Sequence, residues 1–220
     1  MDVSKFLKKE LPILAILFAP ITYLLIVWKR LPDQLPAHWN LDGEVDRYGP
    51  KYYLVLLGIG IYLLLLILPK IDPRKKNYDL FSISYYKLRI AIILFFGVIS
   101  SLIITKSLGY NIDLDRIILI GCILLFTVLG NYMGTIKPNW FIGVRTPWTL
   151  ESETVWRKTH LLAGRLWFWM GLILLFISIF LPKDILNLTF FISVIIMVII
   201  PVVYSYIVYQ KEKVQMRKEL

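Results

Sequence analysis

The sequence predicts an all-α fold, a polytopic membrane helical bundle with about six transmembrane helices. Of its 220 residues, 58% are hydrophobic, and its mean hydropathy is +0.68. A soluble domain is about half apolar and mixes its charges throughout the chain. Here the charges cluster between six charge-free runs of 16 to 26 residues, which suit a hydrocarbon layer about 30 Å thick. No soluble remainder is left to bury so many apolar helices.

The expected helices follow the charge-free runs in order: Leu11–Trp28, Tyr52–Pro69, Ile90–Thr105, Ile117–Ile136, Leu166–Pro182 and Ile185–Gln210. The first run is preceded by lysines, as a signal peptide would be. Its length, and the lack of a small-residue cleavage site before Lys29, favour a retained helix instead. We expect two units. Residues 1–89 form a two-helix unit with an outer loop and a basic inner loop, and residues 90–220 form a four-helix unit.

The basic residues predict the orientation. With six spans and the N-terminus inside, the cytoplasmic segments carry 18 of the 25 lysines and arginines, and the outer segments carry 7. This positive-inside bias predicts a plasma-membrane protein with both termini in the cytoplasm. The net charge of +10 therefore reflects topology. The basic inner loop, residues 70–89, suits an anionic lipid surface, so we expect the lipid bilayer as a partner and no direct contact with nucleic acid.

The ionisable residues argue against several function classes. None of the charge-free runs contains Asp, Glu, Lys, Arg or His, whereas ion-coupled carriers place such groups at membrane depth. The two histidines, His38 and His160, fall on opposite faces of the membrane, so they cannot share a metal within one chain. The single cysteine, Cys122, allows neither a disulfide nor a cysteine metal site within one chain. We expect no enzyme, no cofactor and no metal.

The outer loop, residues 29–51, is rich in proline and glycine, which forbid a continuous helix and indicate a compact, turn-rich loop. Four oxygen-bearing residues alternate in it, Asn40, Asp42, Glu44 and Asp46, but their spacing does not match a calcium loop. A turn at Asp42–Gly43 is the simpler interpretation. His38 and Asn40 flank Trp39 in the middle of this loop, so the candidate ligand-sensing residues are His38, Trp39, Asn40 and Asp46.

A second unusual stretch, residues 130–164, separates the fourth and fifth apolar runs, and we call it the signature segment. We expect the Asn131 amide to hydrogen-bond an adjacent loop, and Asn139–Gly143 to form an apolar turn at the membrane interface. The planar guanidinium of Arg145 suits a carbonyl, a carboxylate or a lipid phosphate. Either Thr146, before Pro147, or Ser152 caps the helix that follows.

The second half of the signature segment has helical periodicity. Trp156, His160, Ala163–Gly164 and Trp167 recur at a spacing of three or four residues and share one helix face. One interpretation is that Trp156 and His160 pack against helix ends and pin the segment to the bilayer. The other is that the segment is a docking platform for a cytoplasmic partner. The candidate residues of this segment are Asn131, Asn139, Gly143, Arg145, Pro147, Trp156 and His160.

Two stretches of the chain resemble known families. The outer loop, through Pro36, His38, Trp39, Asn40, Gly43, Asp46 and Lys51, resembles a domain of unknown function common at the N-terminus of bacterial and archaeal membrane proteins. The stretch GNYMGTIKPNWFIGVRTPWTLESETVWRKTH resembles the signature of the SdpI immunity-protein family. The resemblance implies a multi-pass plasma-membrane protein. In this family the best-known member protects a sporulating bacterium from its own secreted peptide toxin, and draws a small transcriptional repressor to the membrane.

The hypothesis that follows is a non-enzymatic immunity and receptor protein. A secreted peptide toxin would engage the outer loop, and a cytoplasmic transcriptional repressor would dock on the signature segment. Two alternatives from other classes stay open, a small-molecule or ion transporter and a structural envelope protein.

Overall fold

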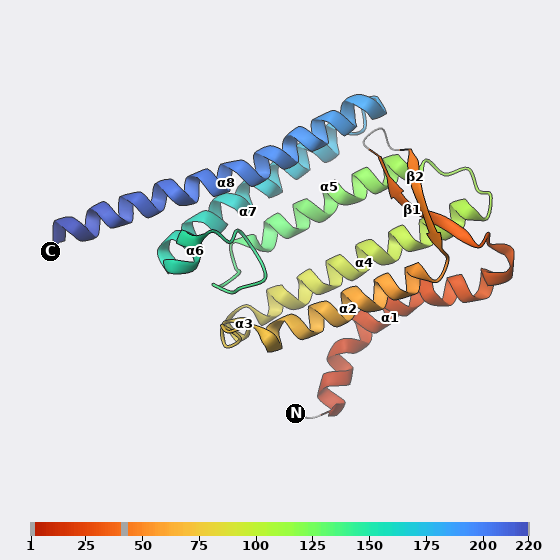
Figure 1. Ribbon diagram of the computed structural model, residues 1–220, viewed down its shortest axis with the longest axis horizontal. Coiled ribbons are helices and arrows are strands. Elements are labelled where there is room, and N and C mark those ends of the chain that lie inside the picture. The colour runs from red at the N-terminus through yellow and green to blue at the C-terminus, as the bar shows by residue number, and fades with distance from the viewer. Residues whose placement is uncertain (1–2, 41–43, 220) are drawn as a thin grey trace. The chain divides into compact units, whose positions relative to one another are not determined.

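The computed structural model describes residues 3–40 and 44–219. The turn expected at Asp42–Gly43, and with it the Asp42 position of the oxygen-rich stretch, lies outside the described residues. In chain order the elements are α1 (Val3–Val27), a 3₁₀ turn η1 (Trp28–Arg30), β1 (Gln34–Trp39), β2 (Val45–Pro50), α2 (Tyr53–Ile71), α3 (Asn77–Leu80), α4 (Ser82–Ser107), α5 (Leu114–Met133), α6 (Pro147–Glu151), α7 (Glu153–Ile177) and α8 (Lys183–Glu219) (Figure 1).

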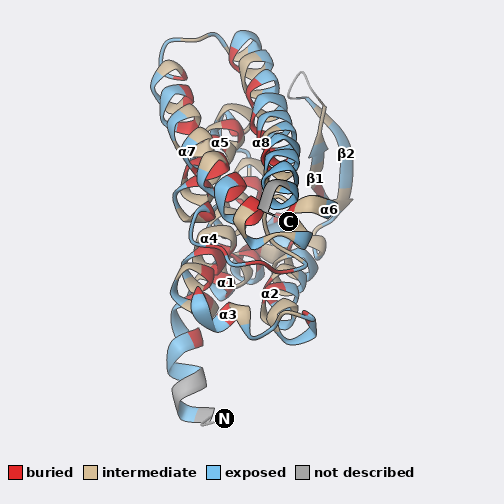
Figure 2. Ribbon diagram, turned by 90° about the vertical axis from the view of Figure 1, so that its left-hand side faces the viewer, coloured by how far each residue is buried: buried red, intermediate tan, exposed pale blue. Residues whose placement is uncertain are grey.

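Six helices in the described part of the chain are long and apolar enough to cross a membrane, α1, α2, α4, α5, α7 and α8. The prediction of an all-α membrane bundle with about six spans is confirmed. Large apolar side chains lie exposed on these helices, including Ile26 at 76%, Phe176 at 65% and Ile173 at 58% exposure. Figure 2 shows that exposed residues dominate the surface of α8. In water such surface would be a liability, whereas lipid tails are as apolar as these side chains.

Tertiary contacts divide the chain into two compact units. The first comprises Met1–Leu66 and Arg89–Gly121, and the second comprises Ile67–Leu88 and Cys122–Leu220. The boundary expected between residues 89 and 90 remains a prediction.

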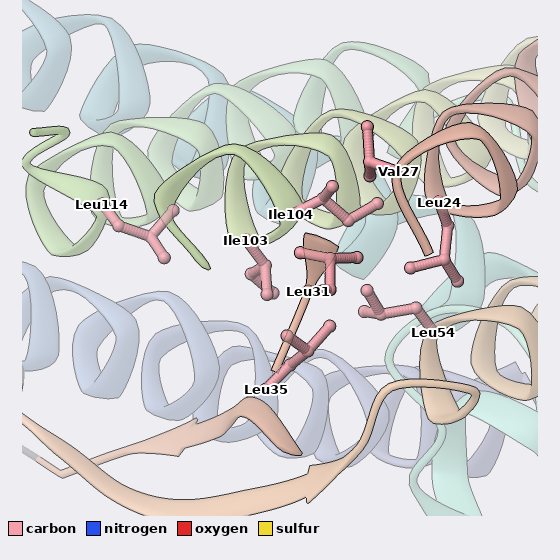
Figure 3. Close-up of a cluster of buried hydrophobic side chains, with 8 residues drawn as sticks. All are labelled: Leu24, Val27, Leu31, Leu35, Leu54, Ile103, Ile104 and Leu114. Carbon is pink, nitrogen blue, oxygen red and sulfur yellow. The ribbon is translucent and has the colours of Figure 1, made fainter. Parts of the chain in front are cut away.

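The first unit is built from α1, α2, α4 and the start of α5 around one apolar cluster (Figure 3). This cluster contains Leu24, Val27, Leu31, Leu35, Leu54, Ile103, Ile104 and Leu114. Pro20 has no amide hydrogen, so the carbonyl of Ile16 loses its helical donor. Gly97 of α4 packs there, since an added Cβ would lie only 3.4 Å from that carbonyl oxygen. Proline and glycine together let α1 and α4 approach closely.

A two-stranded antiparallel hairpin, β1 and β2, completes the first unit. Prolines and glycines were expected to produce a turn-rich loop, and the strands were not foreseen. Leu35 is fully buried in the apolar cluster and Trp39 packs against it, so the hairpin is attached through its apolar face. The Tyr53 hydroxyl donates to the Pro36 carbonyl at 2.5 Å, and Lys51 Nζ donates to the Trp28 carbonyl at 3.2 Å.

The second unit depends on glycine contacts between α5 and α7. A Cβ added to Gly130 would lie 2.6 Å from the Phe168 amide nitrogen, and one added to Gly171 would lie 2.1 Å from Thr127 Oγ1. Small residues of this kind let helix backbones approach in membranes, where packing replaces the hydrophobic effect as the driving force. A second apolar cluster lies in this unit and contains Tyr78, Phe81, Tyr85, Leu88, Met133, Ile136, Trp156 and Ala163.

Candidate functional site

The signature segment is held by the short stretch that follows α2, where the sequence had suggested no site. Asp72 there is only 2% exposed. Its Oδ1 accepts from the Arg74 amide at 2.7 Å, and its Oδ2 accepts from the Trp140 amide at 2.9 Å and from the Tyr78 hydroxyl at 3.2 Å. Burial, and then the neighbouring Asp72 carboxylate, raise the pKa of Tyr78, which therefore stays a neutral donor. These bonds to a carboxylate are stronger than bonds between neutral groups.

Two more side chains of the same stretch bond to the signature segment. Asn77 Nδ2 donates to the Pro138 carbonyl at 2.6 Å, and Arg74 Nη2 donates to the Leu150 carbonyl at 2.7 Å. Both acceptors are backbone groups that regular secondary structure does not use. The loop therefore obtains from Asp72, Arg74 and Asn77 the hydrogen bonds that a helix or sheet would otherwise supply.

Asn139 is the centre of the turn that was expected to be apolar. It is fully buried, and its Oδ1 accepts from the amides of Phe141 at 2.9 Å and Ile142 at 2.7 Å. Its Nδ2 donates to the carbonyls of Lys137 at 2.9 Å and Ile142 at 3.1 Å. The turn at Asn139–Gly143 is therefore not wholly apolar as expected. Its first residue, Asn139, is a buried polar side chain that hydrogen-bonds the backbone of the turn. Trp140 next to it is 47% exposed.

Gly143 and His160 fit each other closely. Gly143 has φ +104°, and a Cβ there would lie 2.2 Å from His160 Nε2. His160 Nε2 accepts from the Val144 amide at 3.1 Å, and Nδ1 lies 2.8 Å from the Trp156 carbonyl. An amide only donates and a carbonyl only accepts, so these partners select the neutral ring with its hydrogen on Nδ1. His160 is thereby a fixed acceptor for the backbone of the loop.

The predicted shared face of α7 is confirmed as a buried face. Trp156 is 1% exposed, His160 and Ala163 are fully buried, and the Trp156 and His160 rings stack at 4.0 Å between centroids. Trp156 Nε1 donates to the Ile136 carbonyl at 2.8 Å. Neither ring reaches the surface, so any effect of these residues on a partner must pass through the shape of the loop.

Both capping alternatives occur, because the helix expected after Pro147 is two helices. Thr146 caps α6, its side chain accepting from the Thr149 amide, and Ser152 caps α7, its side chain accepting from the Val155 amide. The hydroxyl of Thr149 also donates to the Val144 carbonyl at 2.9 Å. This pair of caps makes a sharp corner between the loop and α7.

The exposed residues of the segment form its candidate contact surface. Arg145 and Pro147 are exposed, and Arg145 Nη1 donates to the carbonyl of Trp140. Trp148 lies beside them, with its Nε1 donating to Ser205 Oγ on α8. Asn131 is exposed too, and its side chain has no hydrogen bond among residues 3–40 and 44–219, so its expected bond to an adjacent loop stays a prediction. The helix still continues two residues beyond it, which leaves its side chain on the surface.

The hairpin presents its polar residues differently. His38 Nδ1 lies 2.6 Å from Asp46 Oδ1, and their side chains are 54% and 44% exposed. Asn40 Oδ1 accepts from the Glu44 amide at 2.8 Å and shapes the chain near the hairpin end. Trp39 is half-buried, and its Nε1 is buried with no hydrogen-bond partner in the described part of the chain. Of the four predicted sensing residues, His38 and Asp46 are the two that face outward.

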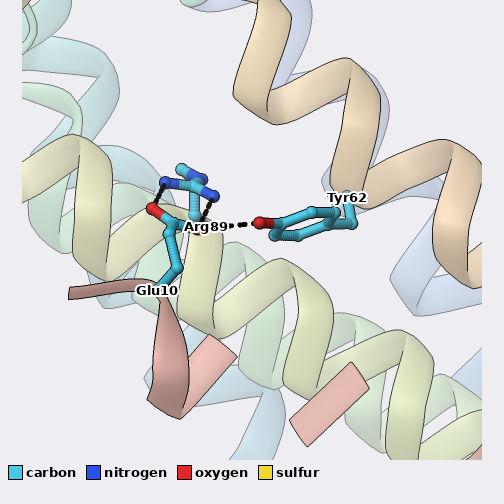
Figure 4. Close-up of polar contacts among 3 residues, drawn as sticks. All are labelled: Glu10, Tyr62 and Arg89. Atoms are coloured by element: carbon cyan, nitrogen blue, oxygen red, sulfur yellow. Dashed lines mark hydrogen bonds and ion pairs between the residues drawn. The ribbon is translucent and has the colours of Figure 1, made fainter. Parts of the chain in front are cut away.

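A buried ion pair in the first unit was missed by the sequence analysis (Figure 4). Arg89 donates to the Glu10 carboxylate through Nη1 at 2.8 Å and Nη2 at 2.5 Å, and the Tyr62 hydroxyl donates to Glu10 at 3.2 Å. Glu10 is 2% exposed and Arg89 6%. Both residues border charge-free runs, but α1 and α4 extend past those runs and place the pair inside candidate spans. The one sequence signal for this ion pair is that Glu10 and Arg89 have opposite charges and each lies next to a charge-free run.

The polar contacts described above fix the shape of the signature segment and leave part of it exposed as surface. The polar side chains around His160 and Asn139 bond backbone groups of the same loop. No group of three or more His, Cys, Asp or Glu residues that would suit a metal ion occurs within residues 3–40 and 44–219.

Six apolar helices, an exposed apolar surface and a polar loop held between helix ends define a multi-pass helical membrane protein. Comparison with known proteins places it more closely. Residues 135–205 match the SdpI/YfhL protein family, and residues 15–63 match a domain of unknown function (DUF1648). The chain is thus similar to the SdpI/YfhL protein family over residues 135–205.

One relative covers most of the chain. Immunity protein SdpI of Bacillus subtilis (strain 168) is 29% identical over 203 residues, which span 90% of this chain and 96% of that protein. No solved structure matches the chain. The family resemblance stated from the two motifs is therefore confirmed. The SdpI/YfhL match contains Asn139, Gly143, Arg145, Trp156 and His160, and the N-terminal match contains the hairpin.

Proposed function

We propose that this protein is a non-enzymatic immunity and receptor protein of the plasma membrane, which protects its cell against a secreted peptide toxin. The observation that carries the proposal is the similarity to Immunity protein SdpI along nearly the whole chain, 90% of its length. With the positive-inside orientation, both termini and the signature segment are cytoplasmic and the hairpin is outside.

The hairpin is the proposed sensor. His38 and Asp46 form an exposed pair, and the two strands leave backbone edges that an extended peptide can join. Trp39 supplies an indole whose Nε1 lacks a partner in the described part of the chain. We expect His38→Ala, Trp39→Ala, Asn40→Ala and Asp46→Ala each to reduce protection.

The exposed part of the signature segment is the proposed docking surface for a cytoplasmic transcriptional repressor. Arg145 offers a guanidinium at the surface, with Pro147 beside it and Trp140 half-exposed. We expect Arg145→Ala to weaken recruitment of a fluorescently tagged repressor by removing a direct contact. Trp156→Ala should weaken it as well, by disturbing the loop. Recruitment that survives both changes would reject this surface.

The proposal is tested by deleting the gene in the source organism and growing the deletion strain in mixed culture with its parent. The parent supplies the secreted peptide, so the deletion strain should be lost unless it is complemented with the intact gene. As a control, both strains are grown in spent medium of the parent, with and without protease treatment. Protease destroys a secreted peptide, so the treated medium should harm neither strain. Equal survival in untreated and treated medium would reject immunity, and a leaky envelope in monoculture would favour a structural role.

One observation favours a second candidate, a small-molecule or ion transporter. The sequence argument against transport rested on charge-free spans, yet α1 and α4 carry the buried pair of Glu10 and Arg89. Ionisable groups at depth often mark transport pathways. Flux into vesicles containing the purified protein distinguishes the two functions, because an immunity protein of the proposed kind produces none above empty vesicles.

A further inference from the structure

A groove of about 200 Å³ lies between α5 and α7 in the second unit. It is lined by Asn131, Gly134, Leu161, Arg165, Phe168 and Trp169, together with the contact glycines Gly130 and Gly164. The glycines explain its floor, because a Cβ on Gly164 would lie 2.9 Å from the Gly130 carbonyl oxygen. Since the two backbones touch, the bulkier residues around them form the walls.

The polar residues of this groove have no role within the fold. Arg165 and Asn131 are exposed, and neither side chain has a hydrogen-bond or ion-pair partner among residues 3–40 and 44–219. A guanidinium donates in a planar fork that suits phosphate, and the asparagine amide adds a neutral donor. The groove therefore offers a charged and a neutral donor to an anion at one place on the surface.

The surroundings indicate which anion. Both helices are candidate membrane spans, and Arg165 comes directly before the charge-free run Leu166–Pro182, at the boundary of the apolar layer. Trp169, one turn further into that run, is 61% exposed, as expected for an indole at the headgroup level. Phe168 and Leu161 supply an apolar wall next to the donors. The anion that lies at this level of a bilayer is a lipid phosphate.

We propose that this groove binds the phosphate headgroup of an anionic phospholipid, with Arg165 as its main donor and Asn131 as a second. The volume suits a headgroup and is too small for a helix from a second copy of the chain. In the predicted orientation the lipid belongs to the cytoplasmic leaflet, whose anionic surface the basic loops also face. This site is independent of the proposed immunity function.

The test measures lipid retained by the purified full-length protein in native mass spectrometry, after incubation with phosphatidylglycerol or phosphatidylcholine of the same acyl chains. The intact protein should retain phosphatidylglycerol preferentially, and Arg165→Ala should lower that retention by roughly five-fold or more. Asn131→Ala should lower it less, and Arg165→Lys should be intermediate because it keeps the charge and loses the fork.

Arg157→Ala is the matched control, because Arg157 is an exposed arginine of the same helix that does not line the groove. If Arg157→Ala and Arg165→Ala lower phosphatidylglycerol retention equally, the retention reflects general surface charge, and the proposed site is wrong. Complete displacement of the lipid by glycerol 3-phosphate would assign the groove to a soluble phosphate compound. A dimer that dissociates on Arg165→Ala would assign it to a second copy. Each of these outcomes contradicts the proposal.

Discussion

The hairpin and the signature segment, the two motifs that stand out in the sequence, use polar side chains in opposite ways. On the hairpin, His38 and Asp46 meet each other in solvent. In the signature segment, Asn139 and His160 are fully buried and bond the backbone of their own loop. Exposed polar groups are free to meet a ligand, whereas buried ones are committed to shape. The same residue types thus mark a contact surface in one motif and a scaffold in the other.

The ion pair of Glu10 and Arg89 shows that burial, and not membership of one unit, makes this difference. It belongs to the same unit as the hairpin, yet its groups are as enclosed as Asn139. If burial is the cause, substitutions of buried polar groups should lower the free energy of unfolding more than substitutions of exposed ones.

Glu10→Gln should lower the free energy of unfolding by about 3–5 kcal/mol, because it leaves the Arg89 guanidinium buried without its counter-charge. Unfolding of the purified protein by added sodium dodecyl sulfate in a mild detergent measures the change. The double variant Glu10→Met/Arg89→Met removes both charges and should recover most of the loss. A double variant as unstable as Glu10→Gln would show that the pair contributes more than mutual compensation.

Asn139→Ala should lower the free energy of unfolding by about 3–4 kcal/mol, because the amides of Phe141 and Ile142 lose their acceptor inside the loop. Asn131→Ala is the matched control from the same segment, where the side chain is exposed. It should change stability by less than about 0.5 kcal/mol. If both substitutions lower the free energy of unfolding equally in the detergent assay, burial does not explain the difference between the two asparagines.

Gly143→Ala should lower the free energy of unfolding by about 2–3 kcal/mol. A backbone φ of +104° is strained for any residue other than glycine, and the added Cβ would displace the His160 ring. Gly60→Ala in α2, where nothing lies within 4 Å of an added Cβ, should be neutral or slightly stabilising. Because the clash involves His160, Gly143→Ala combined with His160→Ala should cost less than the sum of the single changes. Additive costs would mean that backbone strain alone is responsible.

His38→Ala and Asp46→Ala should each change stability by less than about 0.5 kcal/mol, since exposed pairs contribute little. Their effect should appear instead as lost protection in the mixed-culture assay, at unchanged protein levels. Protection that persists in both variants would count against the hairpin as sensor. A large loss of stability in either would break the contrast with the signature segment.

Much of the fold follows from local pattern. The charge-free runs predict the six spans because hydropathy is a property of each segment by itself, and the spacing of Trp156, His160 and Ala163 predicts their common face on α7. The Asp–Gly pair between two short runs is a sequence signal for the hairpin, whereas the prolines of the same loop argue against strands. The two caps were both foreseen, as rivals, because each is a local signal.

Local sequence patterns predict six membrane spans and a resemblance to the SdpI family, and they single out the two motifs. Which polar residues are buried depends instead on the tertiary structure. Glu10 meets Arg89 from 79 positions away, and Asp72 reaches the amide of Trp140 from 68. No local pattern encodes such pairs, because a hydrogen bond depends on where distant helix ends come together. Membrane passage follows from the residues of each segment, whereas the loops between the spans depend on partners elsewhere in the chain.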